Sequence, residues 1–155
     1  MNSQGQTTSL PLKIYKASAG SGKTFQLAVE YIKLLVLNPM NYQHILAVTF
    51  TNKATAEMKL RILSQLYGVG HGLEDSNDYL AAIKEDSRIA HQHWSDEQIR
   101  QRASKALSLM MHDYSRFRIE TIDSFFQSIV RELARELDLT ANLRVDLNDE
   151  EVLVS

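Results

Sequence analysis

Residues 17–24 of this sequence read ASAGSGKT, and this stretch decides the fold class. It overlaps the end of residues 12–18, which have the composition of a short β-strand. From Thr24 onward the apolar residues recur at helix spacing, which predicts a helix that ends at Asn38-Pro39. A strand, a loop of small residues and a helix form the setting in which a phosphate-binding loop occurs. The alternative interpretation is a chance GSGKT sequence in an unrelated loop.

The residue types of this loop suit the binding of a nucleotide. Gly20 and Gly22 permit backbone angles that side chains forbid, and they let amide groups approach phosphate oxygens. Lys23 supplies a positive charge for the terminal phosphates, and the hydroxyl of Thr24 suits Mg²⁺. We predict ATP and Mg²⁺ as cofactors, Lys23 as the catalytic residue and Thr24 as the metal ligand. The predicted cofactor-binding residues are Ala17, Ser18, Ala19, Gly20, Ser21, Gly22, Lys23 and Thr24.

The pattern that follows the loop predicts an α/β fold. Residues 44–50 (HILAVTF) form a compact apolar run that favours a buried strand, and a second helix is expected from Thr51-Asn52 through about Tyr67. The order of strand, helix, strand and helix predicts parallel strands, with the first helix as a right-handed crossover. The second helix should turn Ala56, Leu60, Leu63 and Leu66 inward and should end at Gly68, Gly70 and Gly72.

The second half of the chain predicts further helices and one more strand. Helices are expected at residues 76–86 and 95–112, the latter opened by a capping box of Ser95 and Gln98. Residues 116–121 alternate like a half-buried strand, and Asp123 should cap a helix that runs to about Leu137. The apolar stripe of that helix comprises Phe126, Ile129, Val130, Leu133 and Leu137.

Composition and charge exclude several classes of protein. The chain has 155 residues, no cysteine and a net charge of only -2, which excludes disulfide-rich and strongly disordered chains. We expect no membrane span and a cytoplasmic location, because no apolar run is long enough and the start does not resemble a secretory signal. Residues 13–67 carry seven basic and two acidic groups, a net charge of +5, whereas residues 113–155 carry five basic and ten acidic groups. A polyanionic partner should therefore bind the first part of the chain.

Three ordered motifs resemble the UvrD/RecB/AddA branch of superfamily I DNA helicases. ASAGSGKT opens with alanine, as the phosphate loop of that branch does, and AVTFTNKATAEM at 47–58 is similar to its motif Ia. ETIDSF at 120–125 is similar to a later motif of the family, in which Asp123 replaces the more frequent histidine. The resemblance covers about residues 12–140 and leans toward the helicase–nuclease side of the branch.

The resemblance implies a P-loop NTPase with a RecA-like parallel sheet, of which this chain holds an incomplete N-terminal part. The divisions that we expect are a mobile tail at 1–11, a P-loop and motif Ia unit at 12–67 and a helical insert at 68–112. A strand–helix unit with the third motif should span 113–140, and a truncated end should span 141–155. The resemblance also implies an ATP-dependent helicase, with a possible exonuclease function and a nuclease or helicase partner subunit.

Single-stranded DNA is the substrate that the resemblance implies. The predicted DNA-binding residues are Thr49, Phe50, Thr51, Asn52, Lys53, Thr121, Asp123, Ser124 and Phe125. The competing interpretation is that the two phenylalanines are core residues and that the polar residues only cap helices. Alternative functions are a small nucleotide or metabolite kinase and a non-catalytic nucleotide-binding module.

Overall fold

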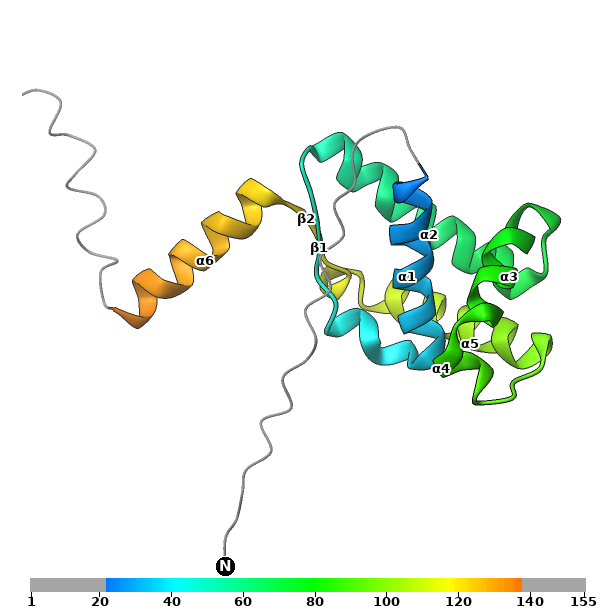
Figure 1. Ribbon diagram of the computed structural model, residues 1–155. Coiled ribbons are helices and arrows are strands. Elements are labelled where there is room, and N and C mark those ends of the chain that lie inside the picture. Colours follow the sequence, from blue (N-terminus) through cyan, green and yellow to red (C-terminus); the bar gives the residue numbers. More distant parts are fainter. Residues whose placement is uncertain (1–21, 138–155) are drawn as a thin grey trace, which may run out of the picture.

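The computed structural model describes residues 22–137, which form a helix-rich α/β unit with one small parallel sheet (Figure 1). The predicted strand at 12–18 and the chain after residue 137 lie outside the described residues. The elements are α1 (Lys23–Leu37), η1 (Pro39–Gln43), β1 (Ala47–Thr49), α2 (Asn52–His71), η2 (Glu74–Ser76), α3 (Asn77–Glu85), α4 (Ser87–Ala90), α5 (Asp96–His112), η3 (Tyr114–Arg116), β2 (Ile119–Thr121) and α6 (Ile122–Glu136).

The two strands lie side by side and run parallel, as the sequence predicts for an α/β chain. Thr49 at the end of β1 pairs with Thr121 at the end of β2. Both strands are shorter than predicted: β1 occupies residues 47–49 of the predicted segment 44–50, and β2 occupies residues 119–121 of the predicted segment 116–121, whose first residue belongs to η3. Figure 1 shows the sheet between α6 on one side and the bundle of the other helices on the opposite side.

The core lies between α1, α2 and α5. Ile32 and Leu35 of α1, Ile62 of α2, and Ile99 and Ala106 of α5 are all inaccessible to solvent or nearly so. α5 packs along α2 and also contacts α1 and η1, so residues 96–112 contribute to the same core as α1. The capping box at Ser95 and Gln98 is present as predicted.

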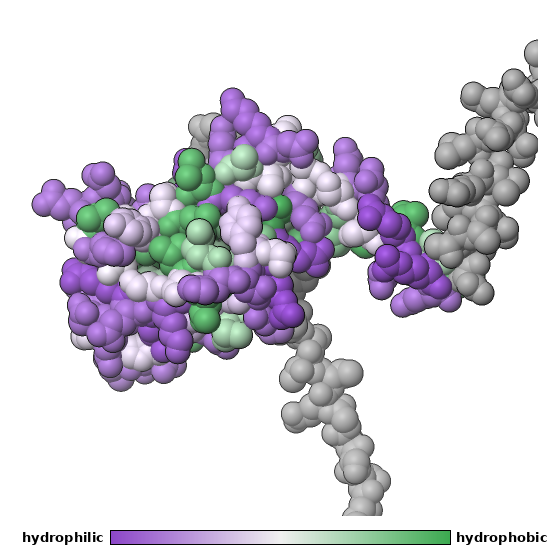
Figure 2. All heavy atoms as spheres, turned by 180° about the vertical axis from the view of Figure 1, so that it is seen from behind, coloured by the Kyte–Doolittle hydropathy of each residue, from purple (hydrophilic) through white to green (hydrophobic). Residues whose placement is uncertain are grey.

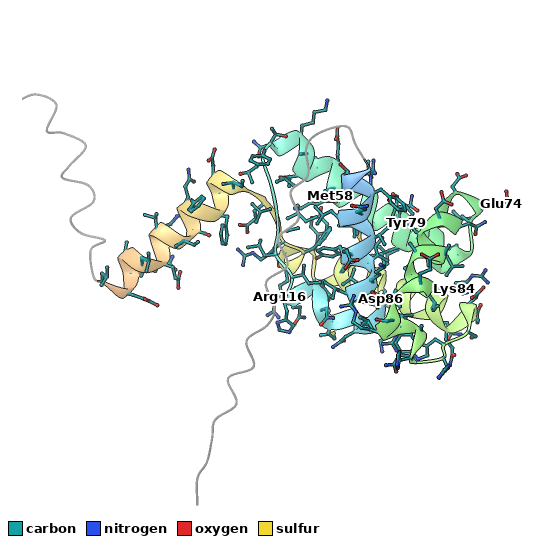
Figure 3. The ribbon with its side chains drawn as sticks, viewed as in Figure 1. Met58, Glu74, Tyr79, Lys84, Asp86 and Arg116 are labelled. Carbon is teal, nitrogen blue, oxygen red and sulfur yellow. The ribbon has the colours of Figure 1, made fainter. Side chains whose placement is uncertain are left out.

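The inward face of α2 differs from the prediction. Leu60 is 69% exposed and Ala56 is also exposed, whereas Met58, Ile62, Leu66 and Val69 are buried. These four positions are spaced by four, four and three residues, which places them on one face of a helix. The prediction was right for Leu66, which is inaccessible to solvent, and for Leu63, which is partly buried against the core, and it was wrong for Ala56 and Leu60. Met58 lies on the buried side of α2, and its position is labelled in Figure 3.

The end of α2 also differs from the prediction, because Gly68 and Gly70 lie inside the helix. A Cβ atom on Gly68 would overlap the hydroxyl of Ser76, and one on Gly70 would overlap the hydroxyl of Ser104 on α5. These glycines therefore allow other segments to approach α2 closely. Only Gly72 ends the helix, with a left-handed φ of 66°.

α6 differs from the prediction in its cap and in its surroundings. Thr121 caps the helix by accepting a hydrogen bond from the backbone N–H of Ser124, and Asp123 is the second residue of the helix rather than its cap. The apolar stripe predicted for α6 is exposed among the described residues, at 60% for Phe126 and 65% for Leu137. Figure 2 shows α6 projecting away from the main body of the molecule. Its stripe therefore does not contribute to the core described above.

Candidate nucleic-acid interface

The sheet brings the second and third motifs to one edge. The parallel register joins Thr49 to Thr121 as the last pair, so the chain leaves both strands at the same end of the sheet. From there Thr51 opens α2 and Thr121 opens α6. Two segments that are distant in the sequence therefore present their loop and helix-start residues side by side.

The segment after β1 presents an aromatic ring and a positive charge to solvent. Phe50 is 76% exposed, although it directly follows a buried residue of the sheet. Asn52 and Lys53 are also exposed, and the Lys53 ammonium lies 3.9 Å from a carboxylate oxygen of Glu57. An exposed pair of this kind is weak, so it competes little with a phosphate for the lysine. The interpretation of Phe50 as a core residue is wrong.

Thr51 has a structural role as the cap of α2, and this role leaves Phe50, Asn52 and Lys53 exposed. Its hydroxyl accepts a hydrogen bond from the backbone N–H of Ala54 at 3.0 Å and caps α2. The positive end of the α2 dipole therefore lies at the same edge as Phe50.

The segment after β2 is polar at its surface. The hydroxyl of Thr121 accepts from the N–H of Ser124 at 3.2 Å and donates to the Ser124 hydroxyl at 3.0 Å. Asp123 and Ser124 are exposed, whereas Phe125 is partly buried and its ring lies 6.1 Å from that of Phe126. Asp123 lies in the first turn of α6, where a negative charge is favourable to the helix dipole.

Thr49 is the one predicted DNA-binding residue whose side chain faces inward. It is 9% exposed, and its hydroxyl lies 2.6 Å from the hydroxyl of Thr55 on α2. No role was predicted for Thr55 from the sequence. Its position four residues after the cap Thr51 could have indicated the hydrogen bond that its hydroxyl makes at the end of β1.

The phosphate loop is described only from Gly22 onward, so Ala17, Ser18, Ala19, Gly20 and Ser21 lie outside the described residues. Gly22 has φ -52° and ψ -3°, which any residue can adopt, so special backbone angles do not explain this glycine. Among the described residues, a Cβ atom added to Gly22 would meet nothing within 4 Å. With respect to residues 22–137, the lack of a side chain therefore leaves open space at the start of α1.

The start of α1 is suited to an anion. Lys23 begins the helix, no side chain caps it, and its first turn holds no acidic residue. The helices α2, α5 and α6 differ, since each has a side-chain cap at its start. No side chain of residues 22–137 therefore caps the first amides of α1, and the helix dipole favours a negative charge there. Thr24, the next residue, is partly buried.

Residues 22–137 hold neither a metal-binding cluster nor a membrane-spanning helix. No group of three or more histidine or acidic side chains that could hold a metal ion occurs among these residues. No helix in the same part of the chain is long and apolar enough to cross a membrane.

Comparison with known proteins identifies the family. A sequence model described as the UvrD/REP helicase N-terminal domain matches residues 3–154, which is nearly the whole chain. The chain belongs to the UvrD/REP helicase family. This membership agrees with the resemblance carried by the three motifs, and it removes the reason for the small-kinase alternative.

The relatives of this UvrD/REP chain include named helicase–nuclease subunits. It is 33% identical to the A-subunit of the ATP-dependent helicase/nuclease of Thermoanaerobacter sp. strain X514 over 140 residues, which covers 89% of this chain and 9% of the relative. It is 41% identical to the RecB subunit of the RecBCD enzyme of Escherichia coli K12 over 69 residues, 37% of this chain and 6% of the relative. The chain thus spans less than a tenth of the length of these relatives. No solved structure matches it.

Proposed function

We propose that this chain is the ATP-binding and single-stranded-DNA-binding part of an ATP-dependent DNA helicase of the helicase–nuclease type, which acts in repair or recombination. The observation that carries the proposal is the shared edge of the sheet, where the register of Thr49 and Thr121 brings two family motifs together and leaves Phe50 exposed. We further propose a P-loop NTPase fold of the RecA-like kind, and a partner that is a nuclease or helicase subunit.

The start of α1 is the proposed site for the phosphates of the nucleotide. The open space at Gly22 and the uncapped amides fit a phosphate chain, and the dipole of α1 adds favourable electrostatics. Lys23 would neutralise phosphate charge and Thr24 would hold Mg²⁺. When bound, ATP supplies the phosphoryl-transfer chemistry that drives movement. The residues of this chain contribute the binding and orientation of its phosphates.

The edge of the sheet formed by β1 and β2 is the proposed DNA-binding surface. A flat exposed ring such as Phe50 can stack on a base, which is worth about 1–3 kcal/mol for each base in single-strand binding proteins. Lys53 and the N-terminus of α2 supply favourable charge for the backbone phosphates next to that base. Ser124 and the start of α6 add polar groups from the second motif. The arrangement holds a strand by stacking and phosphate contacts, which require no particular sequence.

The experiment is a fluorescence anisotropy titration of a labelled thymidine oligonucleotide at low salt. Phe50→Ala should weaken binding about fivefold or more, given the stacking energy above. Lys53→Ala should weaken binding and lower the slope of log K against log salt by about 0.7, as expected for one lost single-strand phosphate contact. Wild-type affinity in both variants would contradict the proposed DNA surface.

Two control variants match these changes in chemistry. Leu60→Ala removes an apolar side chain of similar exposure, 69% against 76%, from a site on α2 away from the sheet edge. Lys105→Ala removes an exposed lysine from α5. Both controls should bind the oligonucleotide like the wild type.

A further inference from the structure

Two threonine hydroxyls form a hydrogen bond between β1 and α2, the two elements that flank Phe50 in the sequence. Thr49 is the last residue of β1 and is 9% exposed, and Thr55 lies in α2 and is partly buried. Their Oγ1 atoms are 2.6 Å apart, a short hydrogen bond in which either can donate. The contact links the strand to the helix across the segment that carries Phe50.

The same hydroxyls reach two backbone carbonyls. Thr49 Oγ1 lies 3.3 Å from the carbonyl oxygen of Thr51 and 3.4 Å from that of Glu120 on β2. Thr55 Oγ1 lies 3.2 Å from the carbonyl oxygen of Thr51. One hydroxyl can donate to the other while the second donates to a carbonyl, so both protons have acceptors. The group thus joins the end of β1, the first turn of α2 and the end of β2.

The hydrogen bond between the Thr49 and Thr55 hydroxyls is not needed to cap α2. Thr51 already caps α2 through the N–H of Ala54. A threonine hydroxyl bonded to the carbonyl four residues earlier is common in helices and by itself indicates nothing further. Here the hydroxyl of Thr55 also forms a hydrogen bond with the nearly buried hydroxyl of Thr49 on β1. These bonds involve Thr49 and Thr51, the two residues that flank Phe50 in the chain.

We propose that Thr49 and Thr55 are positioning residues that hold the backbone on both sides of Phe50, so that its ring stays oriented for stacking on a DNA base. This inference rests on the proposed function, because it assigns a purpose to the orientation of Phe50. Neither hydroxyl contacts DNA: Thr49 acts from within the fold, and Thr55 acts through Phe50. Holding the ring in advance lowers the ordering cost of binding.

The test is a double-mutant cycle on oligonucleotide affinity, measured by anisotropy on the 155-residue chain. Thr55→Val removes the hydroxyl at nearly constant shape, and it should weaken binding about fivefold, the size of one lost hydrogen bond. Thr55→Ser keeps the hydroxyl and should stay within about twofold of the wild type. In a Phe50→Ala background, Thr55→Val should cause no further loss, because the residue through which it acts is gone.

Two results would overturn the inference. The first is wild-type affinity for Thr55→Val. The second is an equal loss from Thr55→Val with and without Phe50, which is the result expected of a general effect on folding. All titrations are made at a temperature where circular dichroism shows every variant to be folded. Thr55→Ala, which suits a helix, replaces valine if the valine variant does not fold.

The cycle separates this inference from the proposal on which it rests. If Phe50→Ala alone binds like the wild type, the proposed DNA surface fails and the inference fails with it. If Phe50→Ala weakens binding and Thr55→Val does not, the surface stands and only the positioning role is wrong.

Discussion

Arg102 on α5 binds the C-terminal end of α1, and its replacement should destabilise the fold strongly. Its Nε donates to the carbonyl oxygen of Val36 at 2.5 Å, and its Nη2 donates to that of Leu37 at 2.7 Å. The guanidinium also lies 4.0 Å from the centre of the Trp94 ring. α1 has no basic residue in its own last turn, so Arg102 supplies the positive charge that the helix end favours.

The magnitude follows from these contacts. Each hydrogen bond from a charged group is worth about 1.5–3 kcal/mol, and the cation–π contact adds about 0.5–2 kcal/mol. Water can satisfy part of the freed carbonyls, so we expect Arg102→Met to lower the free energy of unfolding by about 3–4 kcal/mol rather than by the full sum. Arg102→Lys should recover less than half of the loss, because one ammonium cannot reproduce the planar fork.

The assay is urea unfolding followed by circular dichroism. With a slope of about 1–3 kcal/mol per molar urea, the expected loss moves the midpoint by at least about 1 M. Arg100→Met is the matched control, because Arg100 lies on the same helix, its Nε has no hydrogen-bond partner among the described residues, and its ion pair to Glu97 is long at 3.9 Å. The control should lose less than about 1 kcal/mol. A loss of that small size for Arg102→Met would refute the assigned role.

Three further predictions concern charge, packing and the nucleotide. The hydrogen bond from Arg88 is the largest cause that lowers the pKa of Asp86, labelled in Figure 3, from 3.8 to about 2. The carboxylate therefore contributes about 2 kcal/mol of stability above about pH 4, which is lost as the pH falls toward about 2, and Asp86→Asn should remove this part of the acid transition in thermal melts. Gly70→Ala should cost about 1–3 kcal/mol in urea unfolding, because its Cβ would overlap the Ser104 hydroxyl, and Ser104→Ala in the same chain, which removes that hydroxyl and suits a helix, should restore part of the loss. Lys23→Ala should weaken ATP·Mg²⁺ binding by about 1.5–3 kcal/mol in calorimetry, and unchanged affinity would exclude Lys23 from the phosphate site.

Features that depend on neighbouring residues in the sequence could be predicted. The helix that begins at the phosphate loop and ends at Asn38, and the capping box at Ser95, were both predicted and are present. An α/β arrangement with a parallel sheet was also predicted, and β1 and β2 run parallel, but the sequence did not predict that these two strands are neighbours.

Features that depend on tertiary contacts could not be predicted in the same way. Gly68 and Gly70 read as helix breakers, yet they lie inside α2 because Ser76 and Ser104 approach the helix there. The inward residues of α2 were predicted only in part, because Leu66 is buried whereas Leu60 is exposed, and the contacts of α2 with α1 and α5 decide which side is buried. The inward orientation of Thr49 likewise depends on Thr55, which packs over the end of the strand.

The central claim is that the two motifs form one DNA surface at the shared edge of the sheet, and an NMR titration tests it most directly. The ¹⁵N-labelled chain is titrated with a thymidine octamer at low salt, and the amide shifts are mapped onto the sequence. The largest shift changes are expected at residues 50–53 and 121–124 together, at the same oligonucleotide concentration, with little change at residues 77–112. Changes confined to one of the two segments, or centred on α3 and α5, would contradict it.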